Sequence, residues 1–117
     1  MRIAADIAVA LVALLHVYFL VLEMFLWDKP VGLRAFGLTP EKAALTKSLA
    51  MNQGLYNGFL AAGLAWGIAL GPAGKPVEVF FLGCVIIAGV FGAVTASRKI
   101  LWIQAVPAAV ALALVLL

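Results

Sequence analysis

Two groups of side chains able to do acid–base or hydrogen-bonding chemistry interrupt otherwise apolar stretches of this sequence. In the first stretch, His16 and Glu23 are seven residues apart. At 100° per residue they fall within an arc of about 60° on one helix face, together with Leu20 and Trp27. Helix rise separates the two ionisable groups by roughly 10 Å, so they share a face without a direct hydrogen bond.

The second group lies in the next apolar stretch and forms what we call the polar wedge, made of Asn52, Gln53, Tyr56 and Asn57. Its members make two i,i+4 pairs and cover about 140° of a helix circumference. Gly54 and Gly58 lie beside it and form a small-xxx-small pair that allows another helix to approach closely. Because four polar groups exceed what helix packing requires, we expect a hydrated or ligand-filled pocket here.

These residue types favour acid–base chemistry or the orientation of a polar ligand. We expect Glu23 to carry a proton or contact a substrate, and His16 to act with it. A metal ion and a cofactor are not expected, because one His and one Glu supply too few ligands and the sequence holds no phosphate-binding glycine loop. The candidate ligand-binding residues are Trp27, Asn52, Gln53, Tyr56, Asn57 and Gln104.

The overall composition indicates a membrane protein. The chain has 117 residues, of which 67% are hydrophobic and 11% are charged, against about 25% charged in globular proteins. A domain this small has too much surface for its volume to bury so many apolar side chains. We therefore exclude a soluble domain, and we interpret the net charge of +3 as a topology signal rather than a nucleic-acid surface.

Four apolar stretches are each long enough to cross a bilayer, which takes about 20 residues. They span residues 7–27, 49–70, 77–96 and 100–117. Short connections at 71–76 and 97–99 force antiparallel neighbours. The sequence thus predicts an all-α protein, an integral membrane up-and-down four-helix bundle that forms one domain over residues 1–117.

Two local signals refine this picture. Thr39 is a suitable N-cap and Pro40 fits the first helical position, so the second helix should begin near Thr39. In the last helix, Pro107 lacks an amide hydrogen and strains the carbonyl of Ile103. We expect a kink there, with Gln104 as the nearest side chain able to satisfy the freed carbonyl.

Lysine and arginine are unevenly divided between the two sides of the predicted bundle. One side carries Arg2 and Lys75, and the other carries Lys29, Arg34, Lys42, Lys47, Arg98 and Lys99. The positive-inside rule then predicts a multi-pass protein of the inner (plasma) membrane with both termini outside the cytoplasm. Counting inward from the helix ends, we expect every strongly polar buried residue to lie between the midplane and the cytoplasmic face.

Four segments carry a resemblance to a known family: residues 15–19 (LHVYF), 23–27 (EMFLW), 36–41 (FGLTPE) and 52–61 (NQGLYNGFLA). They resemble the bacterial membrane proteins grouped as domain of unknown function 1304, and the match covers essentially the whole chain. The resemblance implies a small four-helix membrane protein without assigning an activity. It marks as matching the family pattern His16, Glu23, Trp27, Asn52, Gln53, Tyr56 and Asn57.

Three functions are compatible with these features. The first is binding or transformation of a small lipophilic molecule in a polar pocket open toward the cytoplasmic side, with membrane lipid as the surroundings. The second is a proton-coupled exporter of small molecules, against which stand the strong charge bias and the position of Glu23 near a helix end. The third is a structural or partner-binding membrane subunit. A homo-oligomer, if formed, should use the glycine face of the second or the third predicted helix.

Overall fold

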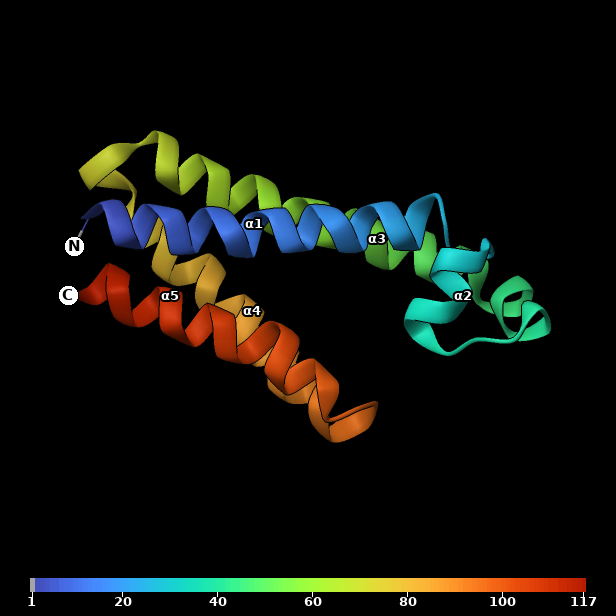
Figure 1. Ribbon diagram of the computed structural model, residues 1–117. Helices are drawn as coiled ribbons and strands as arrows, with labels where there is room; N and C mark the ends of the chain where they lie inside the picture. Colours follow the sequence, from blue (N-terminus) through green and yellow to red (C-terminus); the bar gives the residue numbers. More distant parts are fainter. Residues whose placement is uncertain (1) are drawn as a thin grey trace. The chain divides into compact units, whose positions relative to one another are not determined.

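The computed structural model describes residues 2–117, which form helices joined by short turns and contain no strand (Figure 1). Its α-helices are α1 (Arg2–Met24), α2 (Pro30–Phe36), α3 (Pro40–Ala69), α4 (Lys75–Thr95) and α5 (Val106–Leu116). A 3-10 helix, Gly71–Gly74, precedes α4, and a π-helical turn, Leu101–Ala105, precedes α5. The predicted all-α class is confirmed.

The described residues form two compact units, each of which we describe by itself. The first unit contains residues 2–14 and 60–117, and the second contains residues 15–59. The helices α1 and α3 each contribute one part to the first unit and one part to the second.

The core of the first unit draws on four helices. Its buried side chains come from α1, α3, α4 and α5, and they are Val9, Val12, Leu64, Leu82, Val85, Ala108 and Ala111. The helices α4 and α5 lie side by side in Figure 1. A methyl group on Gly89 would lie 2.8 Å from the backbone nitrogen of Ala105, so α4 and the π turn approach more closely than any side chain at 89 would allow.

The start of α3 agrees with the prediction from its capping residues. This helix begins at Pro40, and the backbone N–H of Lys42 donates to Oγ1 of Thr39 at 3.2 Å. The side-chain oxygen satisfies one of the helix amides that have no partner inside the helix. Thr39 as N-cap and Pro40 as first helical residue are therefore confirmed.

The segment between the first two long helices contains α2, a helix of seven residues that the sequence analysis did not predict. It begins with Pro30 and ends at Gly37, whose φ of 62° places it in the left-handed region that glycine adopts without strain. A methyl group on Gly32 would lie 1.9 Å from the carbonyl oxygen of Leu26, so α2 packs directly on the chain leaving α1.

The predicted irregularity before Pro107 takes the form of the π turn. The backbone N–H of Val106 donates to the carbonyl of Leu101, five residues earlier. This wider turn lies where proline removes the normal bond to Ile103. Gln104 lies in the turn and is half-buried.

Two segments of the described chain are long and apolar enough to cross a membrane: α1, and residues 71–95 with α4. Only 22% of the most apolar window of each is buried, unlike the core helix of a soluble protein. Residues 101–116 form a shorter apolar helix. The second predicted span, residues 49–70, lies in α3, where the polar wedge lowers the hydropathy, and it does not belong to these two segments.

Candidate functional site

The side chains of Glu23 and Asn57 meet inside the second unit. Glu23 lies in the last turn of α1 and is 9% exposed, and Asn57 lies in the middle of α3 and is 5% exposed. Nδ2 of Asn57 donates a hydrogen bond of 2.5 Å to Oε1 of Glu23. A buried carboxyl group needs such a partner, because desolvation without one is costly.

Glycines on the same face of α3 make this approach possible. A methyl group on Gly54 would lie 2.5 Å from Cγ of Met24 and 3.2 Å from Cβ of Glu23. One on Gly58 would lie 2.7 Å from a side-chain carbon of Leu20. The glycine face of α3 is therefore occupied by α1, and it is not the free surface that an oligomer contact would need.

His16, the second ionisable group of α1, is fully buried at 0% exposure. Its ring lies edge-on to that of Phe19, with 5.7 Å between ring centroids. It is about two helical turns from Glu23 along α1, as the shared helix face predicts.

The rest of the polar wedge does not join this pair. Asn52 and Gln53 are exposed, and Tyr56 is 54% exposed. Nδ2 of Asn52 donates to the backbone carbonyl of Ser48 one turn earlier, at 3.1 Å. Of the four wedge residues, the structure brings only Asn57 to Glu23.

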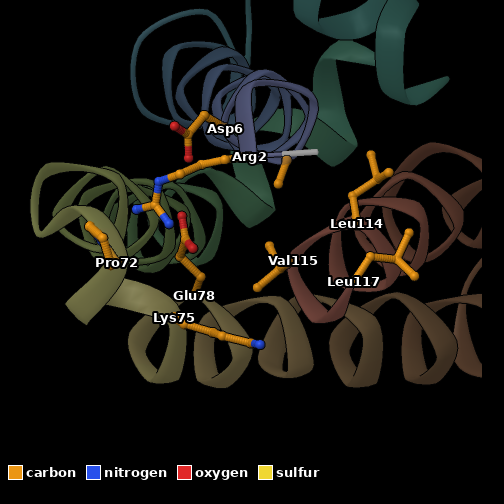
Figure 2. A pocket seen from close by; sticks show the side chains of 9 residues that line it. Arg2, Asp6, Pro72, Lys75, Glu78, Leu114, Val115 and Leu117 are labelled. Carbon is orange, nitrogen blue, oxygen red and sulfur yellow. The ribbon is translucent and has the colours of Figure 1, made fainter.

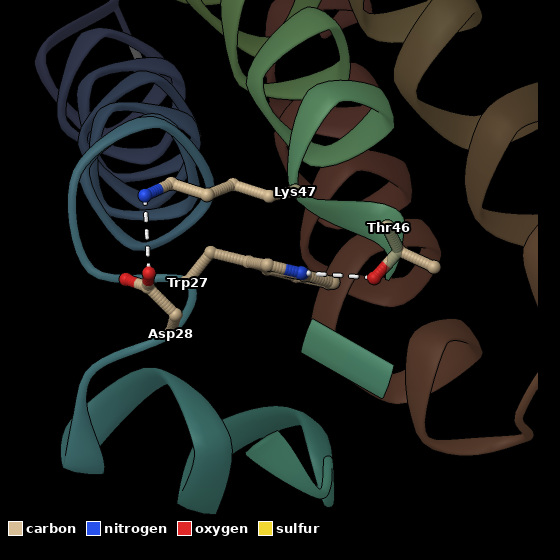
Figure 3. A network of polar contacts seen from close by, with 4 residues as sticks. All are labelled: Trp27, Asp28, Thr46 and Lys47. Atoms are coloured by element: carbon tan, nitrogen blue, oxygen red, sulfur yellow. Dashed lines mark hydrogen bonds and ion pairs between the residues drawn. The ribbon is translucent and has the colours of Figure 1, made fainter. Parts of the chain in front are cut away.

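Trp27 holds the end of α1 to the start of α3 (Figure 3). Its indole N–H donates to Oγ1 of Thr46 at 3.0 Å, and its ring packs against Phe36 of α2 with centroids 4.8 Å apart. Next to it, Nζ of Lys47 pairs with Oδ2 of Asp28 at 3.0 Å. The hydrogen bond from Lys47 holds the pKa of Asp28 below its ordinary value.

Gln104, the last residue predicted for the site, lies in the first unit, whereas Glu23 and Asn57 lie in the second. Its place in the π turn agrees with the predicted irregularity near Pro107. We therefore treat Gln104 separately from the pair formed by Glu23 and Asn57.

The sequence analysis missed a cavity of about 250 Å³ in the first unit (Figure 2). Its ionisable lining residues are Arg2, Asp6, Lys75 and Glu78, and none of the predicted site residues lines it. Glu78 is only 7% exposed. The expectation that every strongly polar buried residue lies toward the cytoplasmic end is therefore wrong, because Glu78 follows the connection on the opposite side of the predicted bundle.

A signal for Glu78 was present in the sequence. It is the second residue of the predicted span 77–96, and an ionisable residue inside a span indicates a functional site. The sequence analysis did not single it out; it lies close to the glycine- and proline-rich connection at residues 71–76.

Comparison with known proteins gives two matches. The family model described as "Protein of unknown function (DUF1304)" matches residues 10–116. The chain is also similar to uncharacterized protein YpaA of Lactococcus lactis subsp. lactis (strain IL1403), with 31% identity over 106 residues that cover 89% of each chain. No solved structure matches.

Proposed function

The chain belongs to the DUF1304 family, and we propose that this member is an integral membrane protein that binds a small lipophilic molecule at Glu23 and Asn57. The proposal rests on one observation above all, the buried hydrogen bond between these two side chains. It places the bundle in the inner membrane, with both termini outside and the site facing the cytoplasmic half.

The membrane location is supported by the apolar surface of the helices. Large apolar side chains are exposed along α1 and α4, among them Leu11, Leu14, Phe80 and Ile87. Exposed apolar surface on this scale is unstable in water and favourable in lipid. The uneven distribution of Lys and Arg sets the proposed orientation.

The ligand chemistry follows from the hydrogen-bonding capacity of the pair. The carboxyl group of Glu23 has two oxygens, and the amide of Asn57 occupies one lone-pair position on one of them. A ligand hydroxyl or amine can donate to the positions that remain. The surrounding apolar helices favour a ligand whose remaining atoms are lipophilic.

Ligands that copurify with the protein test this proposal. We would purify the protein from membranes, extract the small molecules bound to it and identify them by mass spectrometry. Glu23→Gln keeps the shape and an oxygen that accepts from Asn57, but it removes the charge. We expect a lipophilic compound to copurify with the wild-type protein. Its amount per protein should fall about tenfold in Glu23→Gln, as the loss of one strong hydrogen bond predicts.

Glu41→Gln serves as the matched control, because Glu41 is an exposed residue in the first turn of α3. It should retain the compound at the wild-type level. Identical compounds and amounts in all three proteins would refute the binding proposal and would assign Glu23 the structural role of holding α1 against α3.

A further inference from the structure

The cavity in the first unit has the features of a second binding site. It lies where α1 and α4 begin and where α5 ends, and Glu78 lines it together with Arg2, Asp6 and Lys75. Leu114 and Val115 of α5 supply an apolar wall. At about 250 Å³ it is smaller than typical drug-sized pockets of 300–1,000 Å³, so it suits a small polar group.

Glu78 is the most informative residue of the cavity. It is only 7% exposed, and its side chain accepts no hydrogen bond from any of the described residues 2–117. Every completely buried polar side-chain atom of the described residues does have a partner. The carboxylate oxygens of Glu78 must therefore reach the cavity, where a ligand can donate to them.

The position of Glu78 is set by close packing against α3. A methyl group on Gly67 would lie 2.5 Å from Cγ of Glu78. The backbone of Gly74 in turn lies directly on Gly67. The helices thus hold the carboxylate at a fixed place in the cavity wall.

The charged side chains that line the cavity balance. Figure 2 shows Arg2, Asp6 and Glu78 on the same side of the cavity, and Glu78 lies within electrostatic range of both Arg2 and Asp6. With Lys75, the lining holds two cationic and two anionic side chains. An anionic ligand would meet Asp6 and Glu78, and a cationic ligand would meet Arg2 and Lys75. A zwitterionic ligand can satisfy both pairs.

From this arrangement we propose that the cavity binds the headgroup of an ethanolamine phospholipid. The ammonium group donates hydrogen bonds to Glu78 and Asp6, and the phosphate accepts from Lys75. The acyl chains leave along the wall formed by Leu114 and Val115. A choline headgroup fits less well, because its quaternary ammonium has no N–H to donate to Glu78.

This inference depends on the membrane location proposed above but not on ligand binding at Glu23. The two proposals therefore fail separately: Glu78→Gln tests the headgroup cavity and leaves Glu23 intact.

Native mass spectrometry of the protein in detergent tests the inference directly, because it measures how tightly each lipid binds. The probes are phosphatidylethanolamine, phosphatidylcholine and phosphatidylglycerol with identical acyl chains. We expect wild type to bind the ethanolamine lipid about tenfold more tightly than the choline lipid, as one charged hydrogen bond predicts. Soluble phosphoethanolamine should not displace the lipid at equal concentration.

Glu78→Gln should abolish the preference for ethanolamine over choline while keeping the helical circular dichroism of wild type. Lys75→Gln, which removes a phosphate contact, should weaken both lipids equally. Glu41→Gln should bind as wild type does. Should Glu78→Gln fail to fold, Asp6→Asn at the same cavity provides a second test of the preference.

Three results would overturn the inference. They are equal binding of the three lipids by wild type, tightest binding of phosphatidylglycerol, and an unchanged ethanolamine preference in both Glu78→Gln and Asp6→Asn. Displacement of the lipid by an equal concentration of soluble phosphoethanolamine would refute the assignment to a lipid.

Discussion

Asn57 and Glu23, 34 residues apart in the sequence, are joined by a buried hydrogen bond that ties α3 to the last turn of α1. Both side chains have lost most of their contact with solvent. Each side chain therefore needs the other as its hydrogen-bond partner, because a polar group buried without a partner retains its full desolvation penalty.

Asn57→Ala should destabilise the protein by about 1 to 2 kcal/mol, since it leaves the carboxyl group of Glu23 without its donor. Asn52→Ala is the matched control on the same helix, because Asn52 is exposed and bonds only to the preceding turn of α3. Its effect should stay within about 0.5 kcal/mol. Denaturant unfolding in detergent would measure both, and equal effects would contradict a special role for Asn57.

Gly54→Ala should separate α3 from α1, because the added methyl group would lie 2.5 Å from Cγ of Met24. Such overpacking costs about 1 to 3 kcal/mol. Gly83→Ala in α4 is the control, since a methyl group there meets no atom within 4 Å. Alanine should even stabilise α4 slightly, by its higher helix propensity. A thermal melt of each variant would show whether the two substitutions differ in sign.

The ion pair between Asp28 and Lys47 should make the stability of the protein depend on pH in the acidic range. The pKa of Asp28 is lowered in the folded protein, so folding favours the ionised carboxylate. Its stabilising contribution is complete above the ordinary Asp value and is lost as the pH falls through the lower folded-state value. As the pH is lowered below about 4, the melting temperature of Asp28→Asn should fall less than that of wild type or of Glu41→Gln. High salt should weaken the same contribution, because both side chains are solvent-accessible.

Cysteine accessibility on intact cells would test the proposed orientation. In a Cys84→Ser background, which removes the native cysteine, Lys75→Cys should react with a membrane-impermeant maleimide. Arg34→Cys should react only after the membrane is opened. Labelling of position 34 on intact cells would reverse the predicted topology.

The helical class and the start of α3 could be predicted because their causes are local. Apolar stretches, Thr39 and Pro40 act within one or two turns of the chain. The short helix α2 could not be predicted in this way. Its seven residues are too few for a periodic pattern, and its placement depends on the contact between Gly32 and the backbone of Leu26.

The pairing of Glu23 with the second long helix was predictable in outline from helix faces. The full polar wedge was not a reliable guide, because an arc of about 140° is wider than one helix contact can cover. The contact with α1 is centred on Gly54 and Gly58, and only the edge containing Asn57 adjoins it. Asn52 and Tyr56 lie on the far side of that arc and remain exposed.

The π turn at Leu101–Ala105 has a consequence for chain length. It accommodates one residue more than an α-helical turn, so counting at 3.6 residues per turn through this segment loses phase by about 100°. Deleting one residue from the turn would restore a regular helix but rotate Ile100 away from Gly92, against which it packs. A single-residue gap in an aligned relative at this place would therefore indicate a change of helix phase within the same fold.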